Sequence, residues 1–459
     1  MTILAQGLIN HDVSKKSRLT NRSFWLHILL IVFTAALLRA GLAIPALSDT
    51  ELLMRPDSSG YWNPALALAN GDGWVSAPGM ISPEVVRTIG YPLVLAAVVL
   101  LAGKSLFYAA LSGIILSASA VIPVALAVRK VFGAKAALLA GWLWALNITA
   151  IAVSPLILAD SLLGVLAAWQ FLLCVYFVQD KKLWYIAGAA LLAIVGAFVK
   201  PVNLPVVIIG LPVIALAGYE SRRKLIWSWL IIAVMVGALL VPYWVRNYRL
   251  CGDFDGNSAN IYFHNGSAVM AKVTGESSEI WRQKLLDKAA AEFAADPEKY
   301  ASLTAQNQWK KAQFVQMVKT YPAAAVITHL PNIFNLLPDV PSLLENNRIT
   351  SSGRGTMAVL RQSGVWAAAQ HYLNGRWYLL AGLLPLLIIY AGTLLLALVR
   401  LLIWLKNWQW RYLLLFGVLV FYYIWAPGPV ISPRYLLPAL PMIIFMAVGR
   451  KNNKAEKQK

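Results

Sequence analysis

Two carboxylates lie where the sequence passes between polar and apolar segments. Asp57 stands in a polar run between Arg55 and Tyr61, and Asp160 opens an apolar stretch. Aspartate is a favoured N-cap, so capping of a helix is one interpretation of each residue. The other is an acid/base or metal-binding pair, if the fold brings the two together. Glu84 is a third candidate, for which a solvated loop position is the alternative.

Four basic residues accompany these carboxylates near the edges of apolar segments. They are Arg87, Lys200, Arg246 and Arg434. Any one of them could be a side chain that snorkels to a membrane surface. Together they also offer what a lipid phosphate requires, namely point charges and the bidentate fork of a guanidinium group. We therefore expect a phosphate-binding site among them.

The composition places these residues in a membrane protein. Of the 459 residues, 59% are hydrophobic and only 13% are charged, about half the charged share of a soluble domain. We therefore expect an all-α polytopic membrane protein. The net charge of +20 would suggest nucleic acid in a soluble chain. Here the basic residues lie between apolar segments and mark topology instead, so no nucleic-acid partner is expected.

Windows of spanning length, about 20 apolar residues, indicate ten membrane spans. They are residues 24–47, 106–128, 136–156, 161–178, 183–199, 204–217, 225–245, 377–399, 412–425 and 435–448. Residues 89–102 are also apolar but form a short segment, which we interpret as a juxtamembrane helix lying flat in the interface. If this segment crossed the membrane, the basic clusters after it would move outside, against the positive-inside rule.

The resulting parity predicts a domain organisation with both termini in the cytoplasm. Charged residues such as Asp57 and Asp160 then share the outer face. The predicted parts are a basic N-terminus (1–22), a module of seven spans (23–246) with an outer loop (48–105), an outer, partly helical region (247–376), three further spans (377–449) and a basic tail (450–459).

Several short motifs, taken in order, resemble those of the GT-C superfamily of membrane glycosyltransferases. Asp57 and Tyr61 match a D-x-x-x-Y pattern, and residues 87–92 resemble R-T-P-G-Y-P with Ile89 at the first proline. The later motifs are Ser154-Pro155 followed by Asp160, Val199-Lys200-Pro201, residues 242–248 with Cys251-Gly252, and residues 434–438. The set covers most of the chain and looks most like bacterial relatives of the protein mannosyltransferases and of the lipid A aminoarabinose transferase.

The resemblance implies an activity and roles for particular residues. The activity is inverting transfer of a monosaccharide from a polyprenyl phosphate, such as undecaprenyl phosphate, at the periplasmic face of a bacterial inner membrane. Juxtamembrane helices are implied in the first periplasmic loop. Asp57 would be the catalytic base and Asp160 a second catalytic carboxylate. The donor phosphate would be held by Arg87, Lys200, Arg246 and Arg434, and the substrate would be contacted by Tyr61, Tyr91, Asn247 and Tyr435.

The sequence leaves alternatives open for the cofactor, for the acceptor and for the class of protein. A divalent metal ion is one possible cofactor, with Asp57, Glu84 and His264 as candidate ligands. The acceptor could be lipid A, lipopolysaccharide or O-antigen, another envelope glycan or a protein, and membrane lipids are expected partners. A polytopic transporter or lipid flippase is the rival class, followed by a non-catalytic assembly subunit. Against a transporter, the sequence lacks repeated halves and its distinctive charges gather on one face.

Overall fold

The computed structural model describes residues 20–218, 221–254, 258–331, 333–349, 355–373 and 375–449. Within these ranges the regular secondary structure is helical, and the extended pairing is limited to an isolated bridge between Val75 and Pro83. The predicted all-α architecture is confirmed. Nearly all of the basic N-terminus and the whole basic tail (450–459) lie outside the described residues.

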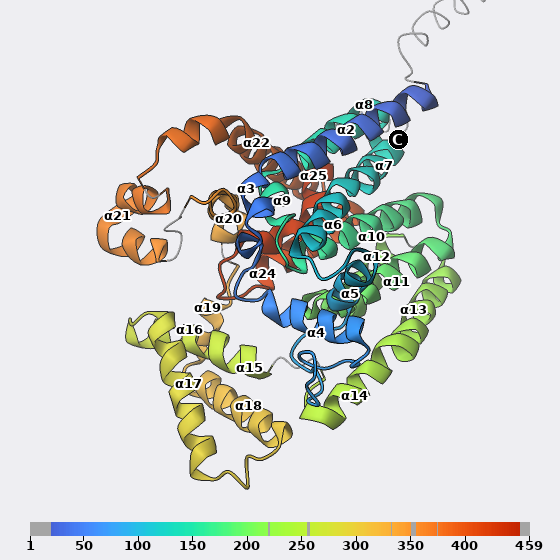
Figure 1. The fold of residues 1–459 in the computed structure, drawn as a ribbon. Helices are drawn as coiled ribbons and strands as arrows, with labels where there is room; N and C mark the ends of the chain where they lie inside the picture. Colours follow the sequence, from blue (N-terminus) through green and yellow to red (C-terminus); the bar gives the residue numbers. More distant parts are fainter. Residues whose placement is uncertain are drawn as a thin grey trace, which may run out of the picture.

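The first half of the chain forms a helical bundle in which α10 is the most enclosed of the long apolar helices. Of its apolar window 72% is buried, against 17% for the helix at Arg222–Cys251. Figure 1 shows α6, α7, α11 and α12 grouped around α10. The elements are α2 (Asn21–Gly41), α3 (Ile44–Ser48), η1 (Thr50–Leu53), α4 (Ser59–Asn70), α5 (Gly90–Ala102), α6 (Leu106–Ser119), α7 (Val121–Phe132), α8 (Ala134–Ala145), α9 (Ile148–Val153), α10 (Asp160–Asp180), α11 (Leu183–Val199), η2 (Pro201–Asn203), η3 (Val206–Gly210), α12 (Leu211–Ala217), α13 (Arg222–Met235), η4 (Val236–Leu240) and α14 (Val241–Cys251).

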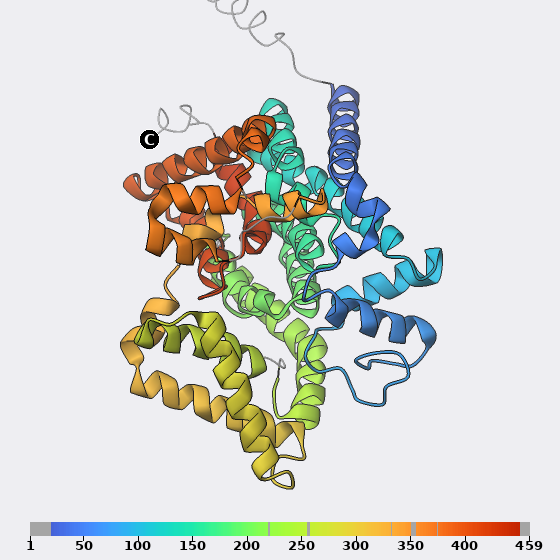
Figure 2. The ribbon, with the colours of Figure 1, turned by 60° about the vertical axis from the view of Figure 1, so that its left-hand side comes forward.

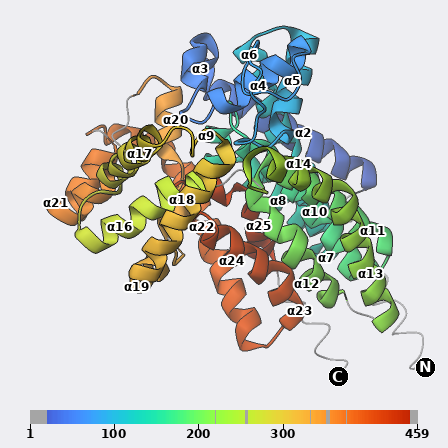
Figure 3. The same ribbon diagram turned by 90° about the horizontal axis from the view of Figure 1, so that it is seen from below.

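The second half adds a lobe of short helices and then returns to the bundle. Figure 2 shows α16 to α19 as a lobe below the bundle, and Figure 3 shows the segment from α23 to α24 beside α12. The elements are α15 (Ser258–Asn260), η5 (Ile261–Asn265), α16 (Gly266–Thr274), α17 (Ser278–Ala295), α18 (Leu303–Thr320), α19 (Pro322–Thr328), η6 (Ile333–Leu336), α20 (Val340–Asn346), α21 (Thr356–Tyr372), α22 (Tyr378–Lys406), α23 (Trp410–Tyr412), η7 (Leu413–Gly417), α24 (Val418–Trp425), η8 (Pro433–Ala439) and α25 (Leu440–Val448).

Five helices in the described ranges are long and apolar enough to cross a membrane. They are Asn21–Gly41, Leu106–Phe132, Asp160–Asp180, Arg222–Cys251 and Ala381–Lys406. Four other predicted windows coincide with shorter apolar helices, at Leu183–Val199, Pro201–Ala217, Leu413–Trp425 and Pro433–Val448. The chain is thus a helical membrane protein with five candidate spans, and the helix at Arg222–Cys251 continues past the domain boundary predicted at residue 246.

The window at residues 136–156 differs from the prediction, because it is two helices. α8 ends at Ala145, and Asn147 is the N-cap of α9. Arg39 on α2 is fully buried and donates hydrogen bonds to the carbonyls of Ala145 (3.1 Å) and Trp144 (3.3 Å). These carbonyls end a helix and lack intrahelical partners, so a cation from another helix satisfies the break. Apolar residues on both sides of it conceal the break from a hydropathy window.

The first loop contributes two helices that are too short to cross a bilayer. α5 has 13 residues, which extend about 20 Å at 1.5 Å per residue, against a hydrocarbon core of about 30 Å. It packs against α4 and against α11. The two helices end at glycines with positive φ, Gly71 and Gly103 (both φ 87°). This loop carries Asp57 and Arg87 to the bundle.

Candidate active site

Asp57 lies in the turn before α4, and its carboxylate binds two arginines. Its Oδ1 accepts a hydrogen bond from Arg87 Nη2 at 2.9 Å, and its Oδ2 accepts one from Arg434 Nη2 at 2.8 Å. Ser58, and not Asp57, holds the N-cap position of α4. The capping interpretation therefore does not describe Asp57. Its side chain is 40% exposed, so its carboxylate remains within reach of a substrate.

Asp160 is the first residue of α10 and is almost completely enclosed. Its Oδ1 accepts a hydrogen bond from Lys200 Nζ at 2.7 Å, and its Oδ2 lies 3.8 Å from Arg434 Nε. No side-chain capping bond occurs at the start of α10. The side chain of Asp160 is 5% exposed. Asp160 is therefore placed to orient cations rather than to meet a substrate.

The two carboxylates join three cations in one alternating series. Its order is Arg87, Asp57, Arg434, Asp160 and Lys200. Each cation contacts a carboxylate, but three cations and two carboxylates leave the series with one positive charge in excess. Arg434 Nε is buried and has no hydrogen-bond partner among the described residues. A buried donor without an acceptor is costly, and an anion would satisfy it. We call these five residues the charge series.

The charges of the series keep Asp57 ionised. Burial alone would raise the pKa of Asp57, but the charges and hydrogen bonds of Arg87 and Arg434 outweigh this effect and hold that pKa below its usual range. Burial lowers the pKa of Lys200, but Asp160, Tyr435 and Tyr61 together outweigh this effect, and the net pKa lies above its usual range. In this arrangement Asp57 is an anion but a weak base, because two cations stabilise its charge.

Aromatic rings surround the cations of the series. The Arg87 guanidinium lies 4.8 Å from the Tyr61 ring centroid, and Lys200 Nζ lies 4.3 Å from that of Tyr435. Cation–π contacts of this kind hold a flexible cation in one orientation. Tyr91 is buried behind Tyr61, with their ring centroids 5.3 Å apart. The structure thus brings Tyr61 and Tyr435 to the charges, whereas Tyr91 supports Tyr61 from behind.

Two glycines allow the first loop to approach the series closely. A Cβ at Gly90 would lie 2.7 Å from the carbonyl carbon and oxygen of Phe198, at the end of α11. A Cβ at Gly60 would lie 2.8 Å from Nε of Arg87. Both contacts are too close for a side chain. The glycine at position 90 therefore lets α5 pack directly on the backbone that precedes Lys200.

Arg246, Glu84 and Asn247 make their contacts outside the charge series. Glu84 Oε1 accepts the backbone N–H groups of Val86 (2.6 Å) and Arg87 (2.8 Å). Arg246 Nη1 donates to the carbonyl of Glu84 at 3.1 Å. Asn247 is buried. In this structure Arg246 holds the first loop against α14, and Asn247 Nδ2 donates to the carbonyl of Phe254 at 3.2 Å. The phosphate contact of Arg246 and the substrate contact of Asn247 stay predictions.

The carboxylates are arranged poorly for a divalent metal ion. Among the described residues, no group of three or more His, Cys, Asp or Glu side chains could hold one. Both oxygens of Asp57 accept bonds from arginines, and Glu84 Oε1 accepts backbone amides. Burial and the charge of Arg282 lower the pKa of His264 below its usual range. The charge of Asp57 acts in the opposite direction. His264 therefore lies near the series, but cations occupy the oxygens that a metal would need.

Arg55 is a residue of the site that the sequence interpretation missed. Its Nη2 donates to Asn346 Oδ1 at 2.8 Å, and its Nε lies 3.2 Å from Glu345 Oε2. Asn346 in turn donates to the carbonyl of Ala152 at 2.8 Å. These contacts fasten the turn before Asp57 to α20 and α9. The sequence holds no signal for them, because the partners are 291 positions apart.

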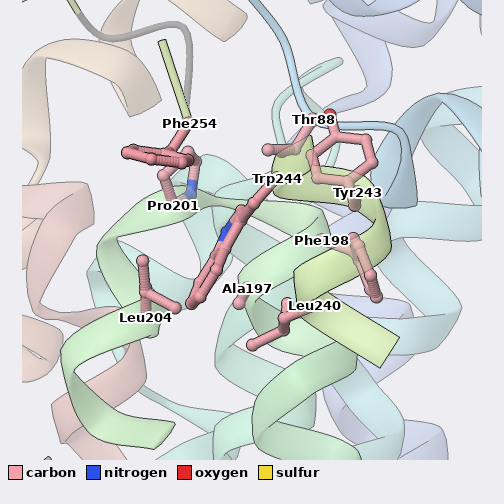
Figure 4. Close-up of a pocket in the computed structure, with 9 residues that line it drawn as sticks. All are labelled: Thr88, Ala197, Phe198, Pro201, Leu204, Leu240, Tyr243, Trp244 and Phe254. Atoms are coloured by element: carbon pink, nitrogen blue, oxygen red, sulfur yellow. The ribbon is translucent and has the colours of Figure 1, made fainter. Parts of the chain in front are cut away.

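A small apolar pocket opens near the ends of the charge series. Figure 4 shows Trp244 crossing its centre, with Phe254, Pro201 and Leu204 on one side and Phe198 on another. The complete lining is Thr88, Ala197, Phe198, Pro201, Leu204, Leu240, Tyr243, Trp244 and Phe254. Thr88 follows Arg87 and Pro201 follows Lys200 in the chain, so the pocket borders both ends of the series.

Comparison with known proteins identifies the fold. No family model matches the sequence, and no curated protein matches it. The oligosaccharyltransferase of Archaeoglobus fulgidus in its apo form matches with a TM-score of 0.51 at 15% identity, over 92% of this chain and 50% of that one. The oligosaccharyltransferase AglB of the same organism, in complex with an inhibitory peptide and a dolichol-phosphate, gives 0.50 at 13% identity over 94% and 50%. ArnT from Cupriavidus metallidurans, bound to undecaprenyl phosphate, gives 0.41 at 17% identity over 94% and 78%.

The chain has the fold of GT-C glycosyltransferases, the class to which the matching oligosaccharyltransferases belong. The resemblance seen in the sequence motifs is thus confirmed for the fold. The chain spans about half the length of the oligosaccharyltransferases that it matches.

Proposed function

We propose that the protein is an inverting glycosyltransferase that moves a monosaccharide from a polyprenyl phosphate, such as undecaprenyl phosphate, to an acceptor hydroxyl. The acceptor belongs to lipid A, lipopolysaccharide or O-antigen, another envelope glycan, or a protein. The reaction takes place at the periplasmic face of a bacterial inner membrane. A fold hosts many activities, so the GT-C fold is compatible with this chemistry and the residues of the site carry it.

One observation carries the proposal: the charge series has one positive charge in excess, and the residues that follow Arg87 and Lys200 in the chain line an apolar pocket. Arg434 Nε lacks an acceptor, and the series contains three cations for two carboxylates. Phe198 and Trp244 also line this pocket. A lipid phosphate combines an anionic head with an apolar tail, so its two parts match these two surfaces.

The reaction balances as a single displacement. The acceptor oxygen forms a bond to the anomeric carbon while the bond from that carbon to the phosphate oxygen breaks. The electron pair of the broken bond leaves with the phosphate, which becomes more negative, and Asp57 accepts the proton of the acceptor hydroxyl. Arg434 and Lys200 stabilise the charge that develops on the phosphate. Attack opposite to the leaving group inverts the anomeric carbon.

Donor binding also accounts for how Asp57 becomes a base. While Arg87 and Arg434 both bond to it, the pKa of Asp57 lies below its usual range. A phosphate that draws one arginine away removes part of that stabilisation, so the pKa of the carboxylate rises. Proton acceptance is then favoured only after the donor is bound, which protects the lipid-linked sugar from premature attack.

The other residues of the site orient the cations or hold the first loop in place. Asp160 holds Lys200 and faces Arg434, and its 5% exposure argues against direct contact with the acceptor. Tyr435 orients Lys200 and Tyr61 orients Arg87. Arg246 acts on the first loop through the carbonyl of Glu84.

The position of the site along α10 supports its assignment to the periplasmic side. Asp160 begins this helix and Asp180 ends it, so the two lie about 30 Å apart, the thickness of a bilayer core. At the Asp180 end lie Lys130 and the basic sequence around it, including Lys181 and Lys182. Basic clusters mark the cytoplasmic side, which leaves the charge series on the opposite one.

Introduced cysteines test this orientation. Ile81 in the first loop is 96% exposed and Lys135 is exposed near the Lys130 end, whereas the native Cys174 and Cys251 are buried. A membrane-impermeant maleimide applied to spheroplasts should label Ile81→Cys at once and Lys135→Cys only after lysis. The opposite pattern would place the site in the cytoplasm.

Transfer of labelled sugar from synthetic polyprenyl-phosphate sugars, by purified protein in detergent, tests the function itself. A panel of donors and acceptor-containing membrane extracts covers the open choice of sugar and acceptor. The expected result is labelled acceptor together with free polyprenyl phosphate. Movement of the intact labelled lipid across vesicle membranes, with no cleavage of the sugar, would favour the flippase instead.

A further inference from the structure

The turn that carries Lys200 is fixed by a residue outside the charge series. Lys200 has an extended backbone (φ −156°, ψ 126°) between α11 and η2. Asn203, three residues later, is 1% exposed. Its Nδ2 donates to the carbonyl of Ala193 on α11 at 2.8 Å, and its Oδ1 accepts the Tyr423 hydroxyl at 2.5 Å. One amide thus connects the turn to α11 and to α24.

The packing around the Asn203 side chain leaves no space for a larger residue at position 196. A Cβ at Gly196 would overlap the amide nitrogen of Asn203, so only glycine allows the side chain to fold back over α11. Tyr422, next to Tyr423 on α24, donates a hydrogen bond to the carbonyl of Val202. Two tyrosine hydroxyls from one helix therefore bond to two successive residues of the turn.

The chain continues from α24 to Arg434, the second cation of the proposed phosphate site. After α24 the chain turns, and the backbone N–H of Ser432 donates to Asn335 Oδ1 at 2.7 Å. Arg434 follows in η8 and reaches Asp57 and Asp160. α24 is thus fastened to the turn of Lys200 near its C-terminal end and continues directly into the segment of Arg434.

We propose that the hydrogen bond from Tyr423 to Asn203 is a positioning device that sets the separation of Lys200 from Arg434, and thereby the affinity for the donor phosphate. This inference rests on the proposed function, in which these two cations hold that phosphate. A lysine stem is flexible, so the location of Nζ depends on the backbone from which it starts. The backbone N–H of Asn203 donates to the Lys200 carbonyl at 3.0 Å, so the amide side chain of Asn203 acts on Lys200 through the backbone of the turn.

Tyr423→Phe removes one hydroxyl and tests the device. We expect the KM for the polyprenyl-phosphate donor to rise roughly fivefold to tenfold, because a misplaced cation holds the phosphate less well. We expect kcat to fall as well, because the same cation stabilises the charge that develops on the leaving phosphate. Tyr185→Phe is the matched control: this buried tyrosine lies near the other end of α11, with its hydroxyl bonded to Asp180. It should lower thermal stability comparably and leave the donor KM unchanged.

Gly196→Ala keeps the test decisive if Tyr423→Phe is poorly folded, and a double variant adds a second readout if it folds. Gly196→Ala displaces the Asn203 amide from the opposite side and leaves both tyrosines intact, so it should raise the donor KM in the same way. In a Lys200→Met background, Tyr423→Phe should add nothing to the donor KM, because residues that act through one group are not additive.

The possible failures are distinguishable. If the wild-type protein transfers sugar but Tyr423→Phe lowers only the melting temperature, the bond is merely structural and the inference is wrong. Full additivity with Lys200→Met has the same meaning. If the wild-type protein binds no undecaprenyl phosphate, the proposed function is wrong, and the inference falls with it.

Discussion

The two ends of α10 carry the same chemical groups in different surroundings. At one end Asp180 pairs with Lys130 at 2.7 Å, and Lys130 lies 4.9 Å from the ring centroid of Tyr176. At the other end Asp160 pairs with Lys200 at 2.7 Å, and Lys200 lies 4.3 Å from that of Tyr435. An aspartate, a lysine and a tyrosine thus lie together at each end of α10.

What differs is how far each pair is enclosed and what it continues into. The Asp180 side chain is 25% exposed, and its pair with Lys130 stands among further basic residues, as expected where long side chains reach a membrane surface. The Asp160 side chain is 5% exposed, and its pair continues through Arg434 to Asp57 with a cation in excess. The comparison teaches that an ion pair at a span end is informative when it is enclosed and continues into further ion pairs.

Asp57→Asn should have the largest effect. The amide keeps the shape of the carboxylate but cannot accept a proton, so we expect transfer to slow by about 100-fold or more while the donor still binds. The measurement is turnover of labelled sugar by purified, monodisperse protein, with Asp180→Asn as the control at the other end of α10. Near-normal turnover in Asp57→Asn would remove the base from the mechanism.

Lys200→Met and Lys130→Met compare the two lysines directly. Loss of a charge-assisted contact is worth roughly 1.5 to 3 kcal/mol, so the donor KM of Lys200→Met should rise on the order of tenfold to a hundredfold. Lys130→Met removes the same kind of ion pair and ring contact and should leave the donor KM unchanged. Equal effects of the two substitutions would make Lys200 another surface anchor.

The pH dependence of stability distinguishes Asp57 from an ordinary exposed carboxylate. Its pKa in the folded protein lies below the usual range because Arg87 and Arg434 outweigh burial. Its stabilisation should therefore be complete above the unfolded pKa, about 3.9, and disappear as pH falls toward the folded value. The melting temperature of wild type minus that of Asp57→Asn, measured without donor, should be constant above about pH 5 and shrink below about pH 4. A gap that stays constant through this acid range would contradict the pairing.

Removal of divalent ions should have the smallest effect. The oxygens of Asp57 are bonded to arginines, so we expect EDTA to leave the initial rate of transfer within about twofold. The assay is repeated with added Mg²⁺ and Mn²⁺. A rate that collapses with EDTA and returns with either ion would show that the arginines give way to a metal.

The sequence predicted the members of the site better than their connections. Asp57, Asp160, Lys200 and Arg434 were found because charges at the edges of apolar segments are costly unless used. Their pairing was not predictable, since Asp57 and Arg434 are 377 positions apart. Local pattern also could not show that Asn247 is buried, because tertiary packing decides that.

The sequence also predicted the fold only in part. Hydropathy located the apolar segments, and the length of residues 89–102 agrees with α5 at Gly90–Ala102. It did not reveal the break after Ala145, because the stabilising group there is Arg39 on a different helix. Asn147, the N-cap of α9, is a local signal at this break, but a hydropathy window does not detect it.

Binding of the lipid carrier without its sugar tests the central claim most directly. Undecaprenyl phosphate and undecaprenol share a tail and differ in the phosphate, so the difference between their affinities measures the contribution of the phosphate. We predict saturable binding of undecaprenyl phosphate to the purified protein, at least about tenfold tighter than that of undecaprenol and weakened in Lys200→Met. Equal affinity for the two lipids, or a phosphate preference that survives in Lys200→Met, would contradict the assignment of the excess charge to a donor phosphate.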